Sequence, residues 1–333
     1  MPDKYQYGVL LPHFGKHASR ERLVGGSQLI ERYGFDSVWV RDHIVFHPHE
    51  HEDPDRTHVD PIVVLSAISA ATKRLKLGTA TLIPHRHPIE MALVLASMEF
   101  VAGTGRIIAG WGLGTYEHEF DAIGMGGWDR KELFPEYIEI MRRLWTGEVV
   151  SHEGKFYRFH DVEIHPVPAS PTSIPIWYGG TRVAAVRRAV QYCEGWLPGR
   201  MPRSDFRRLR ARMEQFAEEY DRPVPTMGLV PFVSPGKTVE GAMKYFDLEG
   251  MMAEMERKKL ARPDPDDIAT WDGHIMAGPP DVLVEDVRKW QEVGVQHLVF
   301  DLRSRFEDWD QMLGVIGEEV LPQLHRGDGR GGD

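Results

Sequence analysis

The sequence predicts a single (β/α)8 TIM barrel of the α/β class, with insertions at the C-terminal face of the strands. Short apolar runs alternate with amphipathic helical patterns from end to end, eight of these runs have the length of strands, and 333 residues suit one large barrel. The eight candidate strands lie near Tyr7–Leu11, Ser37–Val40, Leu75–Leu82, Arg106–Trp111, Ile174–Tyr178, Gly195–Leu197, Thr226–Val233 and Gln296–Asp301.

The helical segments between these strands carry readable start and stop signals. Asp60 is a good N-cap for a helix with Pro61 at its first position, and Lys73-Arg74 suit the negative end of that helix. Near the C-terminus, Pro279-Pro280-Asp281 opens a helical pattern that Gly294 closes before the last strand. These signals support the alternation of strand and helix that a barrel requires.

Two connections are longer than ordinary turns. Residues 112–173 include a predicted hairpin around Glu153-Gly154, and residues 234–278 have the pattern of a charged helical insertion. Long segments at the catalytic face of a barrel often act as lids. We therefore expect one barrel domain over residues 1–325 with these two insertions, followed by a flexible, Gly- and charge-rich tail over residues 326–333.

Composition excludes several classes of protein. Hydrophobic residues make up 42% and charged residues 27%, which is ordinary globular composition. The 40 Lys and Arg against 50 Asp and Glu give a net charge of −10, which disfavours a general nucleic-acid coat or a binder of anionic membranes. The single Cys193 suits a reducing compartment, and the N-terminus lacks a signal-peptide pattern, so we expect a cytoplasmic protein without a membrane anchor.

A polar triplet, Arg41-Asp42-His43, follows the second candidate strand. Catalytic groups of barrels lie at the carboxyl ends of strands, and a histidine can take or give a proton near neutral pH. His43 is therefore a candidate acid/base or a hydrogen-bond donor to a cofactor. The alternative is a capped loop, because polar residues at strand ends also satisfy backbone groups.

The third and fourth strands end in small residues. Ala80 and Thr81 leave room for a flat ring, although small residues also fill tapered barrel interiors. After the fourth strand, alternate glycines at 110, 112 and 114 allow close approach to a ligand. Their G-x-G-x-G spacing and mid-chain position do not match the dinucleotide fingerprint, so a classical NAD-binding domain is not predicted.

The fifth strand ends in Tyr178-Gly179-Gly180-Thr181 and runs into a helix that starts near Val183. Two glycines let backbone N–H groups turn toward an anion, and the helix N-terminus adds positive potential. We therefore predict a phosphate site there, although an empty turn would use glycine as well. The arginines that follow, which either attract a polyanionic ligand tail or form a solvated helix face, are Arg182, Arg187, Arg188, Arg200, Arg203, Arg207, Arg208, Arg210 and Arg212.

Other chemistries find little support. The segment His47–Asp53 is rich in potential metal ligands, but its proline and alternating spacing indicate an irregular exposed loop, and no H-E-x-x-H helix accompanies it. We therefore predict no metal. No G-x-S-x-G elbow of a serine hydrolase occurs either.

Taken together, these motifs resemble the bacterial luciferase-like superfamily of flavin- or deazaflavin-dependent oxidoreductases. The resemblance covers most of residues 5–325 and is specific in the order and spacing of its motifs rather than in any one of them. The segments that carry it are residues 34–43, 77–81, 105–110 with the glycines that follow, 119–124, 144–148 and 175–181.

The resemblance implies a cofactor ring at the carboxyl ends of the strands and a phosphate near Gly179, Gly180 and Thr181. It also implies a non-prolyl cis peptide at Ala80-Thr81 behind the ring. Further cofactor contacts would come from Asp42, Leu113, Gly114 and Thr115, and His43 would lie beside the reactive part of the cofactor. Members of the superfamily are commonly dimers, so a homodimer is expected.

Two activities within the superfamily compete. One uses coenzyme F420 for hydride transfer to or from a small organic substrate; the Asp-His form of the second-strand motif resembles this branch. The other uses reduced FMN from a separate flavin reductase to activate oxygen, and Phe46, Trp111, Trp177 and Trp196 either line a dry pocket for it or belong to the core. A reductase for either cofactor is thus a possible partner, and a non-catalytic flavin-binding protein is a third reading.

One position departs from the glucose-6-phosphate dehydrogenase branch. That branch has a catalytic glutamate at the position matching Thr115, and Glu117 or Glu119 replaces it only if the loop is shifted. Oxidation of that sugar phosphate is therefore not the favoured activity, and the sequence leaves the substrate open.

Overall fold

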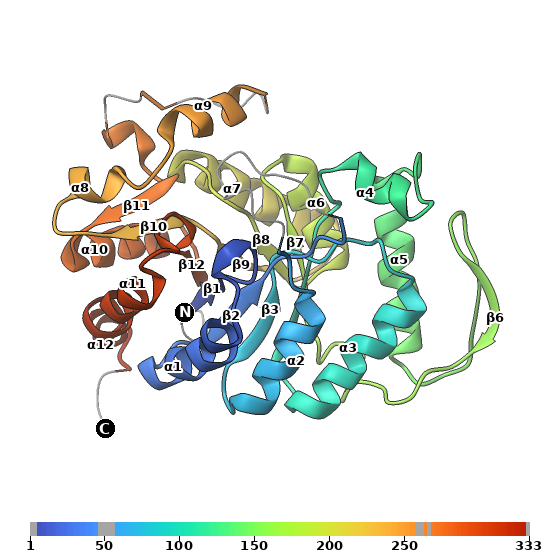
Figure 1. The fold of residues 1–333 in the computed structure, drawn as a ribbon. Coiled ribbons are helices and arrows are strands. Elements are labelled where there is room, and N and C mark those ends of the chain that lie inside the picture. Colours follow the sequence, from blue (N-terminus) through green and yellow to red (C-terminus); the bar gives the residue numbers. More distant parts are fainter. Residues whose placement is uncertain (1–4, 46–56, 258–262, 265–267, 331–333) are drawn as a thin grey trace.

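Eight parallel strands form a closed barrel in the computed structural model, which describes residues 5–45, 57–257, 263–264 and 268–330 (Figure 1). In barrel order the strands are β1 (Gln6–Leu10), β2 (Ser37–Val40), β3 (Lys76–Thr79), β4 (Ile107–Trp111), β7 (Ile176–Gly179), β8 (Gly195–Leu197), β9 (Thr226–Leu229) and β12 (His297–Asp301). The barrel closes because β12 pairs with β1, with His297 opposite Gln6. The predicted TIM barrel is confirmed, and each of its strands overlaps a predicted one.

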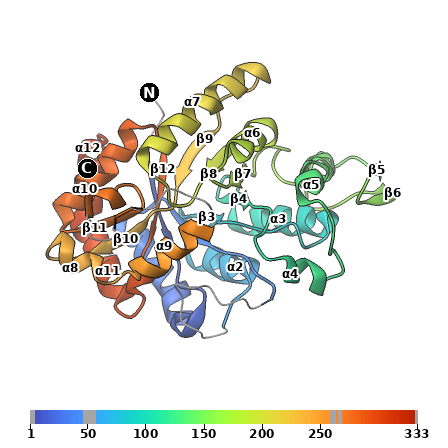
Figure 2. The ribbon, with the colours of Figure 1, turned by 90° about the horizontal axis from the view of Figure 1, so that it is seen from above.

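Helices surround this barrel (Figure 2). They are α1 (Gly26–Tyr33), α2 (Pro61–Ala71), α3 (Pro88–Ala102), α6 (Val183–Tyr192), α7 (Arg203–Glu219), α10 (Pro280–Glu292), α11 (Trp309–Val315) and α12 (Leu321–Gly327). Single π-helical turns cover Glu21–Gly25 and Ile316–Val320, and short 3-10 turns cover Gly15–His17, Ile268–Trp271 and Arg303–Arg305. The predicted start of α2 is confirmed, since Asp60 Oδ1 accepts hydrogen bonds from the N–H groups of Ile62 (2.8 Å) and Val63 (3.2 Å).

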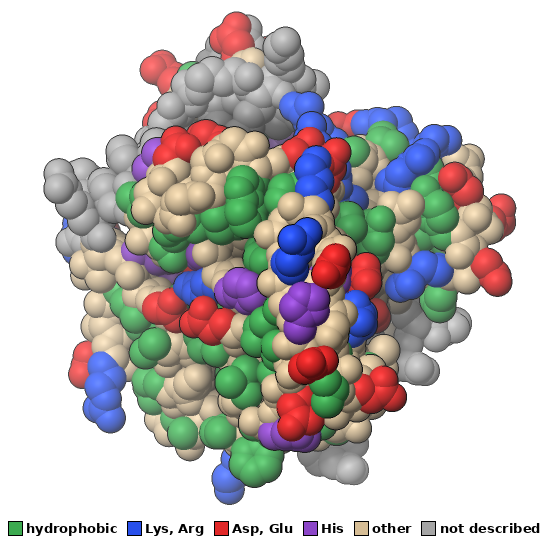
Figure 3. Space-filling view, turned by 90° about the vertical axis from the view of Figure 1, so that its right-hand side faces the viewer, with side chains coloured by type: hydrophobic (Ala, Val, Ile, Leu, Met, Phe, Trp, Pro, Cys, Tyr) green, Lys and Arg blue, Asp and Glu red, His purple; other side chains and the backbone are tan. Residues whose placement is uncertain are grey.

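The first insertion comprises α4 (Glu117–Ala122), α5 (Arg130–Leu144) and an antiparallel hairpin of β5 (Val150–Glu153) and β6 (Arg158–Val162). The hairpin is the predicted one, and the N–H of Gly154 closes its turn on the carbonyl of Tyr157 at 2.9 Å. It lies beyond α5 as seen from the barrel, and its flank displays acidic, basic and histidine side chains side by side (Figures 1 and 3). The hairpin therefore covers a side of the molecule and not the barrel opening.

The second insertion corrects the sequence interpretation. The predicted strand Thr226–Val233 is two strands, β9 and β10 (Phe232–Pro235), and β10 pairs in parallel with a strand that was not predicted, β11 (Ile275–Gly278). Between them lie α8 (Val239–Met243) and α9 (Leu248–Arg257), and α9 is placed above the carboxyl end of the barrel (Figures 1 and 2). The insertion has an apolar cluster of its own, built from Phe232, Ala242, Met243, Met251, Met255, Trp271, Ile275 and Ala277.

Within the predicted flexible tail, residues 326–330 make contacts with the barrel. The hydroxyl of Tyr7 donates a 2.5 Å hydrogen bond to Asp328, and the Arg330 guanidinium lies 3.1 Å from Asp36. The partners are Tyr7 on β1 and Asp36 directly before β2, and the flexibility of the tail stays a prediction. Residues 331–333 lie outside the described residues.

Helices α2 and α3 expose large apolar side chains, and Glu90 is an exposed charged residue on α3. No charged residue occurs in α2, and large apolar side chains on the two helices face solvent, with Phe100 79% and Val101 69% exposed. A helix that is apolar all round is usually covered on both sides. The exposed apolar face of α2 and α3 is therefore a candidate interface for the predicted homodimer.

Candidate active site

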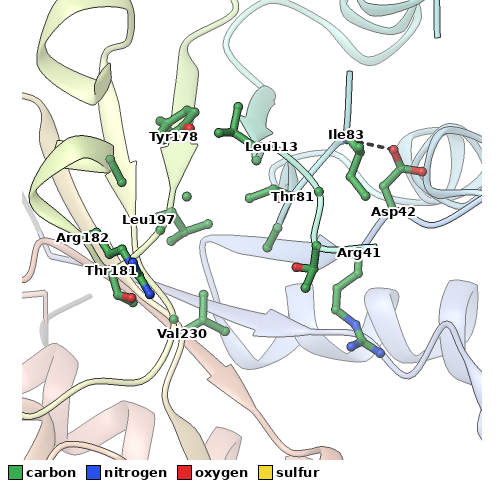
Figure 4. Close-up of a pocket in the computed structure, with 18 of the residues that line it drawn as sticks. Arg41, Asp42, Thr81, Ile83, Leu113, Tyr178, Thr181, Arg182, Leu197 and Val230 are labelled. Atoms are coloured by element: carbon green, nitrogen blue, oxygen red, sulfur yellow. Dashed lines mark hydrogen bonds between the residues drawn. The ribbon is translucent and has the colours of Figure 1, made fainter. Parts of the chain in front are cut away.

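A cavity of about 690 Å³ opens at the carboxyl ends of the barrel strands (Figure 4). This volume is within the usual range for small-molecule sites. All of the site residues predicted from the sequence line it, namely Asp42, His43, Ala80, Thr81, Leu113, Gly114, Thr115, Tyr178, Gly179, Gly180 and Thr181. The structure therefore brings these residues together at one place, while the role of each stays a prediction.

One part of the cavity wall is apolar and closely packed. Leu10, Leu197 and Val230 contribute aliphatic side chains. On the facing side, a Cβ atom added to Gly112 would lie 2.5 Å from Thr81 Oγ1. The peptide bond between Ala80 and Thr81 is cis, as the resemblance implies. A slot with aliphatic walls and little room beside the backbone suits a flat ring.

Another part of the wall is suited to an anion. Gly180 has a φ of +116°, which is accessible to glycine, and the turn Gly179–Thr181 leads directly into α6. Arg182 and Arg188 line the cavity beside this turn. Burial raises the pKa of Tyr178 to about 12, so its hydroxyl remains a donor at neutral pH. These groups lie together where the sequence predicts a phosphate site, and the binding of phosphate there stays a prediction.

Some of the arginines after the fifth predicted strand line the cavity, and others lie on a solvated helix face. Arg182, Arg188 and Arg200 line the cavity. Others belong to the outer surface of α7, where Arg208 pairs with Asp205 at 2.9 Å and Arg210 with Glu214 at 3.0 Å. Sequence reasoning missed Lys131 and Arg303 of the cavity because they come from distant parts of the chain, whereas Arg41 of the predicted polar triplet lines the cavity as well.

Asp42 lines the cavity, but its carboxylate contacts the loop after β3. Its Oδ2 accepts hydrogen bonds from the N–H of Ile83 at 3.1 Å and from Arg86 Nη1 at 2.8 Å, and Figure 4 shows the first of these. Arg86 also reaches Asp60, the N-cap of α2, at 2.7 Å. Burial lowers the pKa of Arg86, but the hydrogen bonds and charges of Asp42 and Asp60 raise it above its usual value. Asp42 therefore joins three segments of the chain.

His43 is held by a carboxylate from the first insertion. Its Nδ1 lies 3.1 Å and 3.2 Å from the two carboxylate oxygens of Glu119 on α4, and the N–H of Ile44 donates to the same group at 3.2 Å. Burial raises the pKa of Glu119, but the hydrogen bond and charge of His43 and the backbone N–H groups of Val45 and Ile44 bring it below its usual value. Glu119 is thus a carboxylate at neutral pH.

Aromatic and imidazole rings surround this pair. The ring of His58 lies edge-on to His43 with centroids 5.4 Å apart, and the ring of Tyr116 lies 5.7 Å away. His85 is buried next to Asp42, with its Nε2 3.4 Å from Oδ2, and burial lowers its pKa. The candidate base therefore occupies a layer of titratable groups on one side of the cavity.

Several alternatives from the sequence can now be resolved. Trp111, Trp177 and Trp196 are buried in the core and none lines the cavity. Phe46 and the segment His47–Asp53 lie outside the described residues. Within the part of the chain that the structure describes, no cluster of three or more His, Cys, Asp or Glu is placed to hold a metal ion. Among the described helices, none is long and apolar enough to cross a membrane.

Known structures share this barrel. An F420-dependent secondary alcohol dehydrogenase, in complex with an F420-acetone adduct, matches with a TM-score of 0.80 and 18% identity over 96% of this chain and 98% of that chain. The oxygenating constituent of 3,6-diketocamphane monooxygenase from Pseudomonas putida, in complex with FMN, matches with a TM-score of 0.76 and 18% identity over 96% of this chain and 98% of that chain. These two likenesses concern the fold alone.

Sequence relatives are more specific. An F420-dependent glucose-6-phosphate dehydrogenase of Nakamurella multipartita is 29% identical over 346 aligned residues, which cover 96% of this chain and 98% of the relative. An enzyme of the same name from Intrasporangium calvum is 31% identical, and the alignment covers 91% of this chain and 94% of that relative. The profile of the family described as luciferase-like monooxygenase matches residues 6–297. The chain therefore belongs to the luciferase-like monooxygenase family.

Proposed function

We propose that this protein is an F420-dependent oxidoreductase that moves a hydride to or from a small organic substrate. The observation that carries the proposal is His43, held by a buried carboxylate at the wall of a cavity that the glycine turn Gly179–Thr181 also lines. The names of the relatives at 29% and 31% identity support F420 as the cofactor.

The cavity residues fit a flat, phosphorylated deazaflavin. Leu10, Leu197 and Val230 offer an apolar surface to a ring, and the turn Gly179–Thr181 with Arg182 offers donors and positive charge to a phosphate. When bound, F420 supplies a carbon that accepts or gives a hydride. The protein's part is to hold the substrate against that carbon and to keep water away.

His43 supplies the proton transfer that accompanies hydride transfer. When an alcohol is oxidised, its carbon loses a hydride and its oxygen loses a proton, and His43 takes that proton. In the reverse direction, the protonated His43 returns it to the carbonyl oxygen. A positioned histidine typically contributes roughly 10²–10⁴-fold to the rate of such a step.

The FMN-dependent alternative requires a cavity that excludes water. Oxygen activation on a reduced flavin needs a dry pocket that protects the reactive species. The tryptophans considered for such a pocket, Trp111, Trp177 and Trp196, lie in the core, so the described part of the chain does not supply that aromatic wall. We therefore favour hydride transfer with F420 over monooxygenation with a separate flavin reductase.

The sugar phosphate of the dehydrogenase relatives is not the substrate we propose. Thr115 lines the cavity, and a hydroxyl there cannot replace an acid that exchanges a proton. Glu119 is 0% exposed and does not line the cavity, so it does not reach a substrate directly. A small alcohol or carbonyl compound fits these residues better.

Equilibrium binding tests the cofactor first. The purified apoprotein is titrated with F420, oxidised FMN and anaerobically reduced FMN, with fluorescence as the readout. We expect binding of F420 to be at least tenfold tighter than binding of either form of FMN. Preference for reduced FMN would overturn the proposal in favour of oxygen activation, and binding of F420 without turnover on a broad panel of alcohols and carbonyls would favour a storage protein.

A matched pair of histidine variants then tests the base. His43→Ala is expected to lower turnover by roughly 10²-fold or more while the Kd for F420 changes little. The control is His160→Ala, which removes an exposed histidine on β6 that does not line the cavity. Loss of F420 affinity with unchanged turnover in His43→Ala would contradict a catalytic role.

A further inference from the structure

Two glutamates on α4 stand in contrasting environments. Glu119 is fully buried and contacts His43, whereas Glu117, two residues earlier, is 56% exposed and pairs with Arg130 at 3.0 Å. Their backbone positions are close, so any difference in their function must come from what each carboxylate touches. Glu119 touches the candidate base, and Glu117 touches a surface arginine.

The contacts of Glu119 indicate which ring nitrogen of His43 carries the proton. A neutral imidazole has one N–H, and a carboxylate can only accept, so the proton of His43 lies on Nδ1 where it faces Glu119. Nε2 then becomes the nitrogen that accepts a proton. The N–H of Ile44 binds the same carboxylate, which fixes the loop after β2 to α4 and with it the direction of the ring.

Other charged and titratable groups near His43 do not replace Glu119 in this contact. The rings of His58 and Tyr116 meet His43 edge-on or tilted. The carboxylate of Asp42 accepts from Ile83 and Arg86, and His85 lies against Asp42. Of the described carboxylates, Glu119 is the one shown in hydrogen-bond contact with His43.

We propose that Glu119 is the positioning residue of His43: it holds the Nδ1–H, directs Nε2 to the cavity and stabilises the imidazolium that forms when Nε2 takes the substrate proton. The catalytic consequence rests on the proposed function, while the placement of the proton does not. Because Glu119 is buried away from the cavity, it acts through His43 and without contact to the substrate.

The variant Glu119→Gln separates positioning from packing. It keeps the size of the side chain but replaces one of the two carboxylate oxygens, which lie 3.1 Å and 3.2 Å from His43 Nδ1, with an N–H donor. An N–H donor facing Nδ1 forces the proton of His43 to Nε2, which removes the acceptor from the cavity. By analogy with the corresponding substitution of a triad carboxylate, kcat is expected to fall by roughly 10²–10⁴-fold.

Histidine ring ¹⁵N spectra of the apoprotein test the placement of the proton without cofactor or turnover, with the His43 signal identified by its loss in His43→Ala. We expect the Nδ1–H form in the wild type and in Glu117→Gln, and the Nε2–H form in Glu119→Gln. An Nε2–H form in the wild type would overturn the proposal even if Glu119→Gln did not fold. So would an unchanged form in a folded Glu119→Gln.

Turnover with F420 tests the catalytic consequence. In Glu119→Gln we expect the loss in kcat stated above, a Kd for F420 within about twofold of the wild type, and an acidic limb of the kcat–pH profile that moves to lower pH. Glu117→Gln should match the wild type in all three. An unchanged kcat and profile in Glu119→Gln would refute the catalytic role, whereas absence of F420 turnover in the wild type would refute the proposed function and leave the ¹⁵N result to decide the position of the proton.

Discussion

The variant Asp42→Asn distinguishes a structural aspartate from a cofactor ligand. In the structure, the Asp42 side chain is fully buried and binds Arg86 through both oxygens, at 2.8 Å and 3.1 Å, as well as the N–H of Ile83. The resemblance to the luciferase-like superfamily instead implies a contact with the cofactor. A structural role stabilises the apoprotein, whereas a cofactor contact acts only when cofactor is bound. The free energy of unfolding of the apoprotein therefore separates the two roles.

The size of the effect follows from the partners that remain. Breaking a buried ion pair by removing one partner typically costs about 3–5 kcal/mol. Arg86 keeps its 2.7 Å contact with Asp60, whose side chain is 42% exposed and therefore screened by solvent. Because Arg86 keeps this second partner, we expect the lower end of that range, a loss of about 3 kcal/mol in the free energy of unfolding.

Urea unfolding of the apoprotein, followed by tryptophan fluorescence, measures this loss as a lower midpoint at an unchanged slope. Adding Arg86→Met removes the orphaned charge, so the double variant should recover about 1 kcal/mol or more relative to additive losses. A free energy of unfolding within about 0.5 kcal/mol of the wild type, combined with weakened F420 binding, would refute the structural role and favour direct contact.

Three further outcomes are expected. Burial lowers the pKa of His297 to about 3, below the ordinary 6.5, so the unfolded chain binds a proton at this histidine at a higher pH than the folded protein does. The free energy of unfolding should therefore drop by up to about 1.4 kcal/mol per pH unit as pH falls below 6.5. In urea titrations at several pH values, His297→Gln should make this dependence on pH less steep. Gly180→Val, at a φ of +116°, should weaken F420 binding at least tenfold and binding of the dephosphorylated deazaflavin much less, and equal losses would contradict phosphate recognition. Finally, we propose that a second copy of this chain covers α2 and α3, so Phe100→Glu should convert a dimer to a monomer in sedimentation velocity, and an unchanged mass would disprove this interface.

The barrel and the place of its site were predictable because both depend on local patterns. Buried parallel strands are short apolar runs, and eight of them are readable. The carboxyl ends of such strands meet at one face of a barrel, so polar and glycine-rich strand ends that are far apart in sequence must converge there. That rule placed residues as distant as His43 and Gly180 in one cavity.

Features that depend on distant contacts were not predictable. The apolar run Thr226–Val233 reads as one strand, yet the chain leaves the barrel at Val230-Pro231 because β10 pairs with β11, which is more than 40 residues away. The same holds for the C-terminal segment, whose Gly- and charge-rich pattern is typical of a loose tail. The contacts of Asp328 and Arg330 with Tyr7 and Asp36 bridge nearly the whole length of the chain, so no local pattern announces them.

The two carboxylates at the site illustrate why roles are harder to predict than positions. Asp42 is next to His43 in the chain, but it binds Arg86, 44 residues away, while the carboxylate that binds His43 is Glu119, 76 residues away. Adjacency in sequence places a residue near a site and leaves the direction of its side chain to the packing of other elements. The two substitutions should accordingly separate: Asp42→Asn in the stability of the apoprotein, and Glu119→Gln in the proton position and turnover of His43.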